Sequence, residues 1–341
     1  METKIVVADF EEWRESVKEA VALLGAGEVV ALPTETVYGL GADVFNSEAV
    51  AKVFEVKERP SFDPLIVHVG RVEDLGKVAE VPEELEEVVA ALTQKFWPGP
   101  LTLILPKKAE VSDLVTSGLP TVAVRLSAHE VMREVAKKLG PVAAPSANRF
   151  GRISPTSARA VEEELGGRIP LIIDGGACRD GLESTIVAPQ IGKKGVELRL
   201  LRPGPVTREE LRDFGKVIVV KKKAGEGVEA PGQVESHYAP GCPVLLFDKP
   251  EDFQPEAGKR YGLLSYRGEE RDGYLGRHDW AATEILSPGS GKLAEAAVRF
   301  FYALRELDRT GVDAIVAEPV SETGLGRALM DRLRRASAAK G

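Results

Sequence analysis

Residues 31–43 read ALPTETVYGLGAD, an apolar strand end followed by hydroxyl side chains around Glu35 and then by Gly39 and Gly41. Glycines that follow an apolar run are typical either of a loop that cradles a nucleotide or of a tight turn. A dinucleotide-binding fingerprint needs a third glycine in the spacing G-x-G-x-x-G, and Val44 occupies that position. The residues alone therefore favour a turn, where glycine is common because it tolerates most backbone conformations.

Short apolar strands and amphipathic helices alternate on both sides of this stretch. Apolar residues recur with the 3.6-residue period of a helix over 11–27, and 47–58 predicts a second helix. Ser127 and Glu130 have the spacing of a capping box, which predicts the start of a further helix. Because several strands also follow one another directly, we expect a mixed α/β sheet. The expected strands lie at 5–8, 28–33, 64–69, 101–105, 121–126, 141–148, 170–176, 184–189 and 197–201.

The length of the chain and one change in composition predict two domains. Single cores rarely grow past roughly 250–300 residues, and this chain has 341. Residues 221–240 are rich in lysine, glycine and proline and have little apolar content, so we interpret them as a linker that could serve as a lid. We expect a catalytic domain at 1–220 and a smaller βαβ-like domain at 241–341.

Charge and composition argue against several classes of protein. The formal net charge of −8 disfavours nonspecific binding to nucleic acid or to anionic membranes, because clustered lysine and arginine carry that binding. Cys178 and Cys242 lie far apart, which makes a disulfide framework or a thiolate zinc site improbable. No run reaches the roughly 20 apolar residues of a membrane helix, and the first ten residues lack the apolar core of a leader. We expect a cytoplasmic protein.

Polar side chains interrupt the apolar segments at several strand ends. Lys57 and Arg59 end a helix, where two cations are often no more than a solvated tail. His68 lies in an apolar strand, where a histidine is more often a core residue than a ligand. Arg125 lies in another apolar strand and needs an anion, because an unpaired buried charge is very costly. With the hydroxyls of residues 144–157, these residues form an inventory suited to a ligand that carries a carboxylate and phosphates.

Seven motifs in a fixed order resemble the YrdC-like domain of threonylcarbamoyl-AMP synthases. The resemblance covers roughly residues 5–215, and the tail resembles the long, two-domain form, more weakly after position 240. The motifs are PTETVYGLGAD at 33–43, KERPSFDPLIVHV at 57–69, FWPGPLTLIL at 96–105, TVAVRLSAHE at 121–130, APSANRFGRISPT at 144–156, GLESTIV at 181–187 and LRPGPV at 201–206.

The resemblance implies a fold and a reaction. The fold would be a twisted mixed sheet with a concave basic cavity, joined to a smaller Rossmann-like α/β domain. The reaction would convert L-threonine, bicarbonate and ATP into threonylcarbamoyl-AMP and pyrophosphate, with Mg²⁺ accompanying ATP and no protein ligand for the metal assigned. A separate transferase complex would then use the product to modify an adenosine next to the anticodon of tRNA, and direct contact of this chain with tRNA would be weak.

The resemblance also implies roles for individual residues. Lys57 and Arg59 would be catalytic and face phosphates and bicarbonate, and the glycines of 31–43 would let the backbone approach the ligand. The L-threonine pocket would comprise Thr36, His68, Arg125, Ala144 and Ser184. The ATP site would comprise Lys57, Arg59, Asp63, Thr121, Ser146, Asn148, Ser154, Arg202, His237 and Tyr238, the last two reaching back from the linker.

Two departures from the family pattern leave details of the site open. Asp63 stands where the family has asparagine, so its carboxylate either contacts a metal ion or is turned away from the triphosphate. The linker keeps Pro231, Gly232 and residues 237–240 but lacks the basic and aromatic residues that the family usually has between them, so the contacts of the lid with the nucleotide stay open.

Two other functions remain open at this stage: a non-catalytic RNA-binding module and a carbamoyl-adenylate-type transferase. Pyrophosphate release that depends on both threonine and bicarbonate would occur only with the synthase.

Overall fold

The computed structural model describes residues 2–8, 13–220, 227–233, 237–270 and 273–338. The chain divides into two compact units. Unit 1 comprises 1–150, 155–179 and 183–234, and unit 2 comprises 151–154, 180–182 and 235–341. Parts of the predicted linker, 221–226 and 234–236, lie outside the described residues, so the boundaries at 220 and 241 stay a prediction.

Unit 1 is built on a sheet of eleven strands in its described residues, in the order β1-β8-β2-β3-β7-β4-β6-β5-β9-β10-β11. Parallel pairs such as β4 with β6 alternate with antiparallel pairs such as β5 with β6, so the predicted mixed sheet is confirmed. The strands are β1 (Lys4–Val7), β2 (Val30–Leu32), β3 (Gly39–Asp43), β4 (Ile66–His68), β5 (Leu101–Pro106), β6 (Thr121–Arg125), β7 (Val142–Ala143), β8 (Leu171–Asp174), β9 (Thr185–Gly192), β10 (Gly195–Arg202) and β11 (Lys216–Val219).

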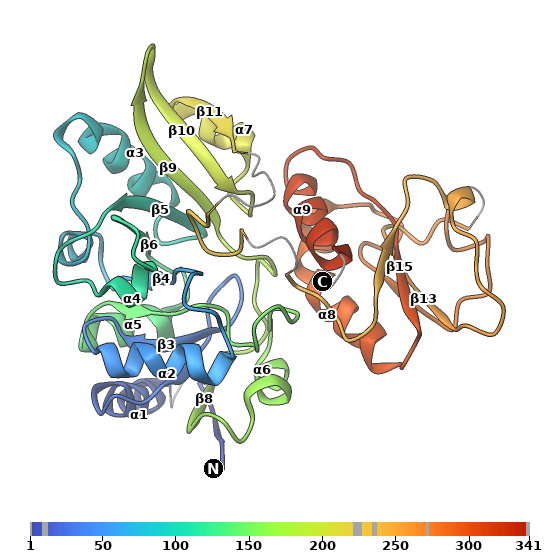
Figure 1. Cartoon of the computed structure of the whole chain (residues 1–341), viewed down its shortest axis with the longest axis horizontal. Helices are drawn as coiled ribbons and strands as arrows, with labels where there is room; N and C mark the ends of the chain where they lie inside the picture. Colours follow the sequence, from blue (N-terminus) through green and yellow to red (C-terminus); the bar gives the residue numbers. More distant parts are fainter. Residues whose placement is uncertain (1, 9–12, 221–226, 234–236, 271–272, 339–341) are drawn as a thin grey trace. The chain divides into compact units, whose positions relative to one another are not determined.

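Helices cover the sheet of unit 1, and its long β9–β10 hairpin projects beyond them (Figure 1). One apolar cluster joins α1 and α5 to β2 and β8, and a larger cluster involves α2, α3 and α6. The helices are α1 (Trp13–Gly25), α2 (Ser47–Lys57), α3 (Glu86–Phe96), α4 (Asp113–Thr116), α5 (Glu130–Leu139), α6 (Ala158–Leu165) and α7 (Arg208–Leu211), with 3-10 turns η1 (Val72–Lys77), η2 (Glu83–Leu85) and η3 (Arg212–Phe214).

The ends of two helices are important for the site. Helix α2 begins at the side chain of Asn46, which accepts hydrogen bonds from two backbone amides, and it ends at Glu58 in the left-handed conformation. Helix α5 begins after His129, whose side chain accepts from the amide of Val131. The predicted capping box of Ser127 and Glu130 is therefore wrong, because the helix begins two residues later: His129 is its N-cap and Glu130 its first residue, while the hydroxyl of Ser127 accepts from the amide of His129.

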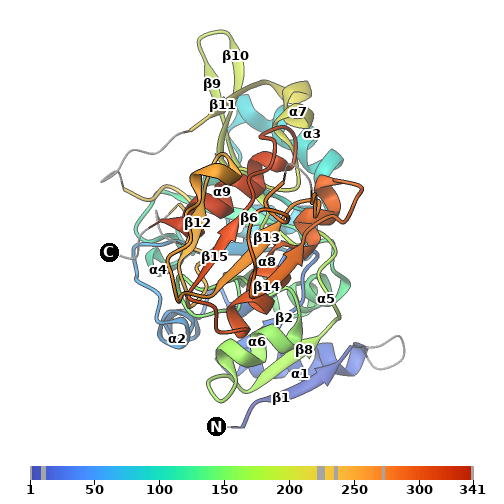
Figure 2. The same ribbon diagram turned by 90° about the vertical axis from the view of Figure 1, so that its right-hand side faces the viewer.

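Unit 2 contains a parallel sheet in the order β12-β15-β13-β14, visible in Figure 2. Its strands are β12 (Val244–Leu246), β13 (Tyr261–Ser265), β14 (Ala282–Ile285) and β15 (Ala314–Ala317), and its helices are η4 (Pro250–Asp252), α8 (Leu293–Arg309) and α9 (Gly326–Ser337). The predicted α/β character of this region is confirmed. Unit 2 also takes in residues 151–154, and within it Arg305 donates a hydrogen bond from Nη2 to the carbonyl of Ile153 at 2.9 Å.

Candidate functional site

Strand register places His68 and Arg125 side by side. They are direct partners in the parallel pair β4–β6, although 56 other residues separate them in the sequence. Strand β7 lies on the other side of β4, and the amide of Ala144, just after it, donates to the carbonyl of Ile66 at 2.8 Å. Three residues predicted to bind threonine therefore lie on neighbouring strands.

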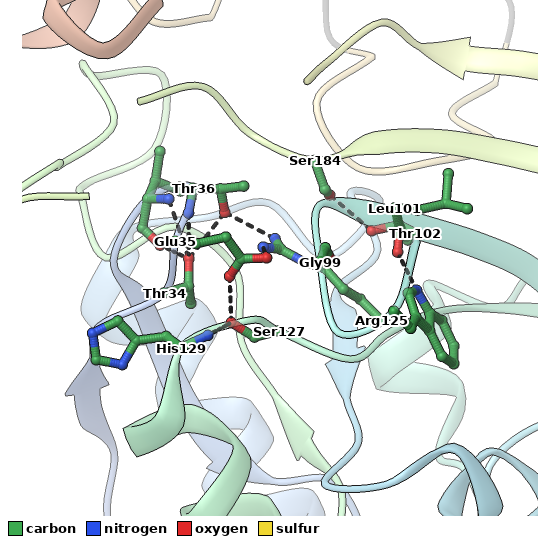
Figure 3. A network of polar contacts seen from close by, with 12 residues as sticks. Thr34, Glu35, Thr36, Gly99, Leu101, Thr102, Arg125, Ser127, His129 and Ser184 are labelled. Atoms are coloured by element: carbon green, nitrogen blue, oxygen red, sulfur yellow. Dashed lines mark hydrogen bonds and ion pairs between the residues drawn. The ribbon is translucent and has the colours of Figure 1, made fainter. Parts of the chain in front are cut away.

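The guanidinium of Arg125 is the centre of this cluster, and it is buried (Figure 3). Its Nε donates to the carbonyl of Gly99 at 3.2 Å, and its Nη1 donates to the hydroxyl of Thr36 at 2.8 Å. Its Nη2 lies 2.6 Å from Oε1 of Glu35, although without the alignment of a hydrogen bond. The anion that Arg125 needs is thus supplied within the chain.

A turn at residues 34–37 brings Glu35 and Thr36 to that guanidinium. The hydroxyl of Thr34 donates to the carbonyl of Val37 at 2.6 Å and accepts from the amides of residues 36 and 37. Threonine commonly closes turns in this way. The stretch at 31–43 therefore contains a hydroxyl-closed turn, as its residues indicated.

The glycines of β3 make room for neighbouring chain. A Cβ atom at Gly39 would lie 3.2 Å from the Cβ of Ala144, and one at Gly41 would lie 3.1 Å from a methyl group of Val142. Both distances are tighter than ordinary contacts. Side chains on or beside β7 therefore require glycine at these positions, and the expectation that the glycines let the backbone approach the ligand stays a prediction.

Glu35 is the residue of this cluster that the prediction of site residues omitted. Its Oε2 accepts a hydrogen bond from the hydroxyl of Ser127 at 2.5 Å. Burial alone would raise the pKa of Glu35, but the charge of Arg125 and the hydrogen bonds from Ser127 and the backbone of Ala128 lower it to about 2. The requirement of Arg125 for an anion, together with a carboxylate inside the TET triplet, was the signal that could have found it.

His68 is uncharged in this environment. Burial and the nearby charge of Arg125 lower the pKa of His68 to about 3, although Glu35 and a backbone hydrogen bond with Ala144 oppose the shift. Its Nδ1 is buried and makes no hydrogen bond to any residue that the structure describes. The histidine therefore offers an uncharged ring beside the guanidinium.

Ser184 and Arg202 form a second group of contacts. The hydroxyl of Ser184 lies 2.7 Å from that of Thr102, and Nη2 of Arg202 donates to it at 3.1 Å. Arg202 also donates from Nε to the carbonyl of Ser184 at 3.0 Å and from Nη1 to the carbonyl of Pro231 at 3.4 Å. The structure therefore joins a predicted threonine residue to a predicted ATP residue.

Lys57, at the end of α2, holds the segment that carries Ser146 and Asn148. Its Nζ donates to the carbonyls of both residues at 2.5 Å. Burial, and then the charge of Arg59, lower the pKa of Lys57 well below its usual range, against the opposing effects of Asp63 and Glu164. The cation that was predicted to face phosphates is engaged with backbone oxygens here.

Arg59 lies beside Asp63. Its Nη2 is 2.9 Å from Oδ2 of Asp63, and its Nε donates to the carbonyl of the same residue at 3.1 Å. Both side chains are buried. The carboxylate of Asp63 faces the guanidinium of Arg59, and the choice between a metal contact and a carboxylate turned away from the triphosphate stays a prediction.

The segment held by Lys57 runs beside the turn that carries Thr36. The amide of Leu40 donates to the carbonyl of Pro145, and the amide of Ala147 donates to the carbonyl of Tyr38. The predicted phosphate residues and threonine residues of unit 1 are therefore tied together through β3.

Thr121 lies at the opposite end of β6 from Arg125, on the same face because strand side chains alternate. It lines a surface groove of about 450 Å³ together with Ile104, Leu201 and other residues. The apolar cluster between the two ends comprises Ile66, Ile104, Ala123, Ile186, Leu201 and Ala230. This face of the sheet thus changes from charged to apolar along β6.

Three predicted ATP residues, Ser154, His237 and Tyr238, belong to unit 2, and their roles stay predictions. The amide of His237 donates to the carbonyl of Arg335 at 3.2 Å, and the ring of Tyr238 packs against that of Phe301. In the described residues, no group of three His, Cys, Asp or Glu side chains could hold a metal ion. No helix among them is long and apolar enough to cross a membrane.

Comparisons with known proteins agree along the whole chain. A family model described as "Telomere recombination" matches residues 22–204, and one described as "Threonylcarbamoyl-AMP synthase, C-terminal domain" matches 206–338. The chain is 42% identical to a threonylcarbamoyl-AMP synthase of Pyrococcus abyssi, over 96% of this chain and 95% of that protein. It is 40% identical to the Bacillus subtilis protein of the same name, over 94% and 92% of the two chains.

A solved structure shows the same fold. The crystal structure of P. abyssi Sua5 complexed with L-threonine matches with a TM-score of 0.84 and 39% identity, over 99% of this chain and 98% of that one. That protein therefore binds threonine on a scaffold similar to the one described above.

Proposed function

Because the chain belongs to the threonylcarbamoyl-AMP synthase family, we propose that the cluster around Arg125 is the L-threonine site of that reaction. The chain is an enzyme that forms a threonylcarbamoyl adenylate and serves tRNA modification. What we propose concerns the residues, the second substrate and the metal.

The observation that supports the threonine site is the state of Arg125. Its guanidinium is buried and pre-oriented by Gly99 and Thr36, and its Nη2 makes no aligned hydrogen bond to a described residue. A planar fork of this kind matches a carboxylate in two places. The hydroxyl of Thr36 and the uncharged ring of His68 then lie beside the amino acid.

The chemistry requires that the enzyme hold the reactants in position, more than that it supply a nucleophile of its own. We propose that the threonine amine attacks the carbon of bicarbonate, which loses the elements of water and leaves a carbamate. The carbamate oxygen then attacks the α-phosphorus of ATP, the bond to the β-phosphate breaks, and pyrophosphate departs. Holding the reactants in line can supply up to ~7–11 kcal/mol, and cations that neutralise the developing charge add to this.

Lys57 and Arg59 are the cations proposed for that neutralisation. Both are buried beside the segment that carries Ser146 and Asn148. In this proposal the triphosphate takes over the contacts that Lys57 makes with backbone carbonyls and that Arg59 makes with Asp63. The adenine would lie on the apolar face toward Thr121.

Mg²⁺ is proposed to enter with ATP. Asp63 is the predicted ATP residue that carries a carboxylate, and Arg59 neutralises it. The described residues supply no set of three metal-ligating side chains, so phosphate oxygens and water would provide most of the coordination. A separate transferase complex is proposed to consume the adenylate. The relatives compared above are all synthases, so neither alternative function is favoured.

The test is a set of omission reactions. Pyrophosphate release is measured with ATP and Mg²⁺ while threonine or bicarbonate is left out in turn, and the adenylate is identified by mass. We expect release only when both are present. Release that ignores either substrate would contradict the proposed use of that substrate.

A further inference from the structure

Glu35 lies against Arg125 inside the proposed threonine site. Its carboxylate is 4% exposed. One oxygen is 2.6 Å from Nη2 of Arg125, and the other accepts a hydrogen bond from Ser127. Figure 3 shows Glu35 extending between these two partners. Both oxygens of the carboxylate therefore face a partner, Arg125 on one side and Ser127 on the other.

The charges in this cluster cancel. Arg125 carries one positive charge and Glu35 one negative charge, and burial together with Arg125 keeps His68 uncharged. The hydrogen-bonding capacity of Arg125 is not used up, because the bonds to Gly99 and Thr36 leave other N–H groups of the fork. Glu35 therefore neutralises the charge of the guanidinium, while the guanidinium keeps N–H groups that can donate to a ligand.

A neutral site and a free arginine should select different ligands. A buried arginine without a partner attracts any carboxylate. With Glu35 beside it, an added anion also meets a buried carboxylate of the same sign a few ångströms away, where Coulomb energies are several-fold larger than in water. An amino acid is a zwitterion, so its ammonium group compensates that repulsion.

We propose that Glu35 is a specificity-determining residue: its charge beside Arg125 makes the site select a zwitterionic amino acid over a carboxylate anion of the same shape. This inference rests on the proposed function of the Arg125 cluster. It assigns Glu35 no contact with the reacting atoms.

The first experiment uses the intact wild-type chain. Calorimetry compares the binding of L-threonine with that of (R)-3-hydroxybutyrate, which lacks only the ammonium group and is a net anion. We expect the anion to bind at least about tenfold more weakly, a difference near 1.4 kcal/mol. Equal or tighter binding of the anion would overturn the inference. Absence of threonine binding would instead contradict the proposed function.

The second experiment removes the charge of Glu35. Glu35→Gln keeps the shape of the side chain and removes its charge, so the preference for threonine over the anion should fall at least about tenfold. Ser127→Ala is the matched control: it removes a hydrogen bond to Glu35 but leaves the charge, and the preference should stay within about threefold of wild type. An unchanged preference in a folded Glu35→Gln protein would show that Glu35 is only a structural ion-pair partner of Arg125. If that variant does not fold, the wild-type comparison decides alone.

Discussion

Arg125, Glu35 and Lys57 are ionisable side chains that lie almost wholly out of water, and each has partners within the chain. Removing one partner of a buried pair is costly, because the remaining charge stays desolvated. Geometry also matters, since a guanidinium presents a planar fork and an ammonium does not. Substitutions at these positions should therefore affect binding through shape as well as through charge.

Arg125→Lys tests the fork. The substitution keeps the positive charge but loses the planar donors that meet Thr36 and Gly99. We expect the KM for threonine to rise about 10- to 100-fold, the range for charge-assisted hydrogen bonds, while the KM for ATP changes much less. Steady-state kinetics with each substrate varied in turn provides the measurement. An unchanged threonine KM would mean that Arg125 is a structural residue.

His68 should make the fold sensitive to acid. Its pKa is about 3 in the folded chain and 6.5 for the ordinary residue. Below pH 6.5 the unfolded chain takes up a proton that the folded chain does not, so stability falls as the pH falls. Glu35, with a pKa lowered to about 2, adds a further loss only below its ordinary value of 4.5.

Urea unfolding at pH 7 and pH 5 separates the contribution of His68. Between these values, wild type should lose about 2 kcal/mol more stability than His68→Gln, which has no titrating ring. His129 is present in both proteins and cancels in the comparison. The same pH dependence in both proteins would show that His68 titrates normally.

At the scale of elements, the end of β10 and the start of β9 are pressed together to form part of the site. The turn after Arg202 contains Gly204, where an added Cβ would lie 2.5 Å from the amide nitrogen of Thr185 and 2.6 Å from the carbonyl oxygen of Glu183. The hydroxyl of Thr185 also donates to the carbonyl of Val206 at 2.6 Å. The motifs LRPGPV and GLESTIV therefore contact each other directly.

Gly204→Ala should push these two segments apart. Because the obstructing atoms are backbone, they cannot move aside as a flexible side chain would, and we expect a loss of about 1–3 kcal/mol in unfolding free energy. The threonine KM should rise as Ser184 shifts. Gly76→Ala is the control, since no atom lies within 4 Å of its added Cβ, and it should stay within about 0.5 kcal/mol of wild type. Equal stability of the two variants would refute this account.

At the scale of the whole molecule, part of the predicted linker belongs to unit 1. Residues 227–233 pack onto its sheet: Ala230 joins the apolar cluster of that face, and Nε2 of Gln233 donates to the carbonyl of Leu201 at 3.4 Å. A water-labile adenylate gives a reason to cover this face. The closure of the full linker over a nucleotide stays a prediction.

Ala230→Glu tests that cover in the full chain. A buried carboxylate without a partner should expel residues 227–233 from the apolar face, because desolvating a charge is unfavourable. We expect less adenylate to accumulate for each pyrophosphate released, measured by quantifying both products. Val228→Glu adds the same charge at a half-buried position and should have the smaller effect. If both variants retain the adenylate as wild type does, the segment is a passive tether.

Local patterns were enough to predict the mixed α/β class, the α/β character of the C-terminal region and the family. Periodicity of apolar residues depends on neighbours a few positions away, and motifs are contiguous, so both are visible without a structure. The same holds for the turn at 34–37, which is closed by its own hydroxyl. The need of Arg125 for an anion was also evident, because a charge in an apolar strand must be compensated.

Tertiary structure alone decided which groups meet. Register sets His68 opposite Arg125, and the fold brings Glu35 to a guanidinium 90 positions away and to the hydroxyl of Ser127. Inclusion of residues 151–154 in unit 2 was equally invisible in the sequence. These pairings depend on strand order and packing, where many distant contacts must be satisfied together, so no local pattern encodes them.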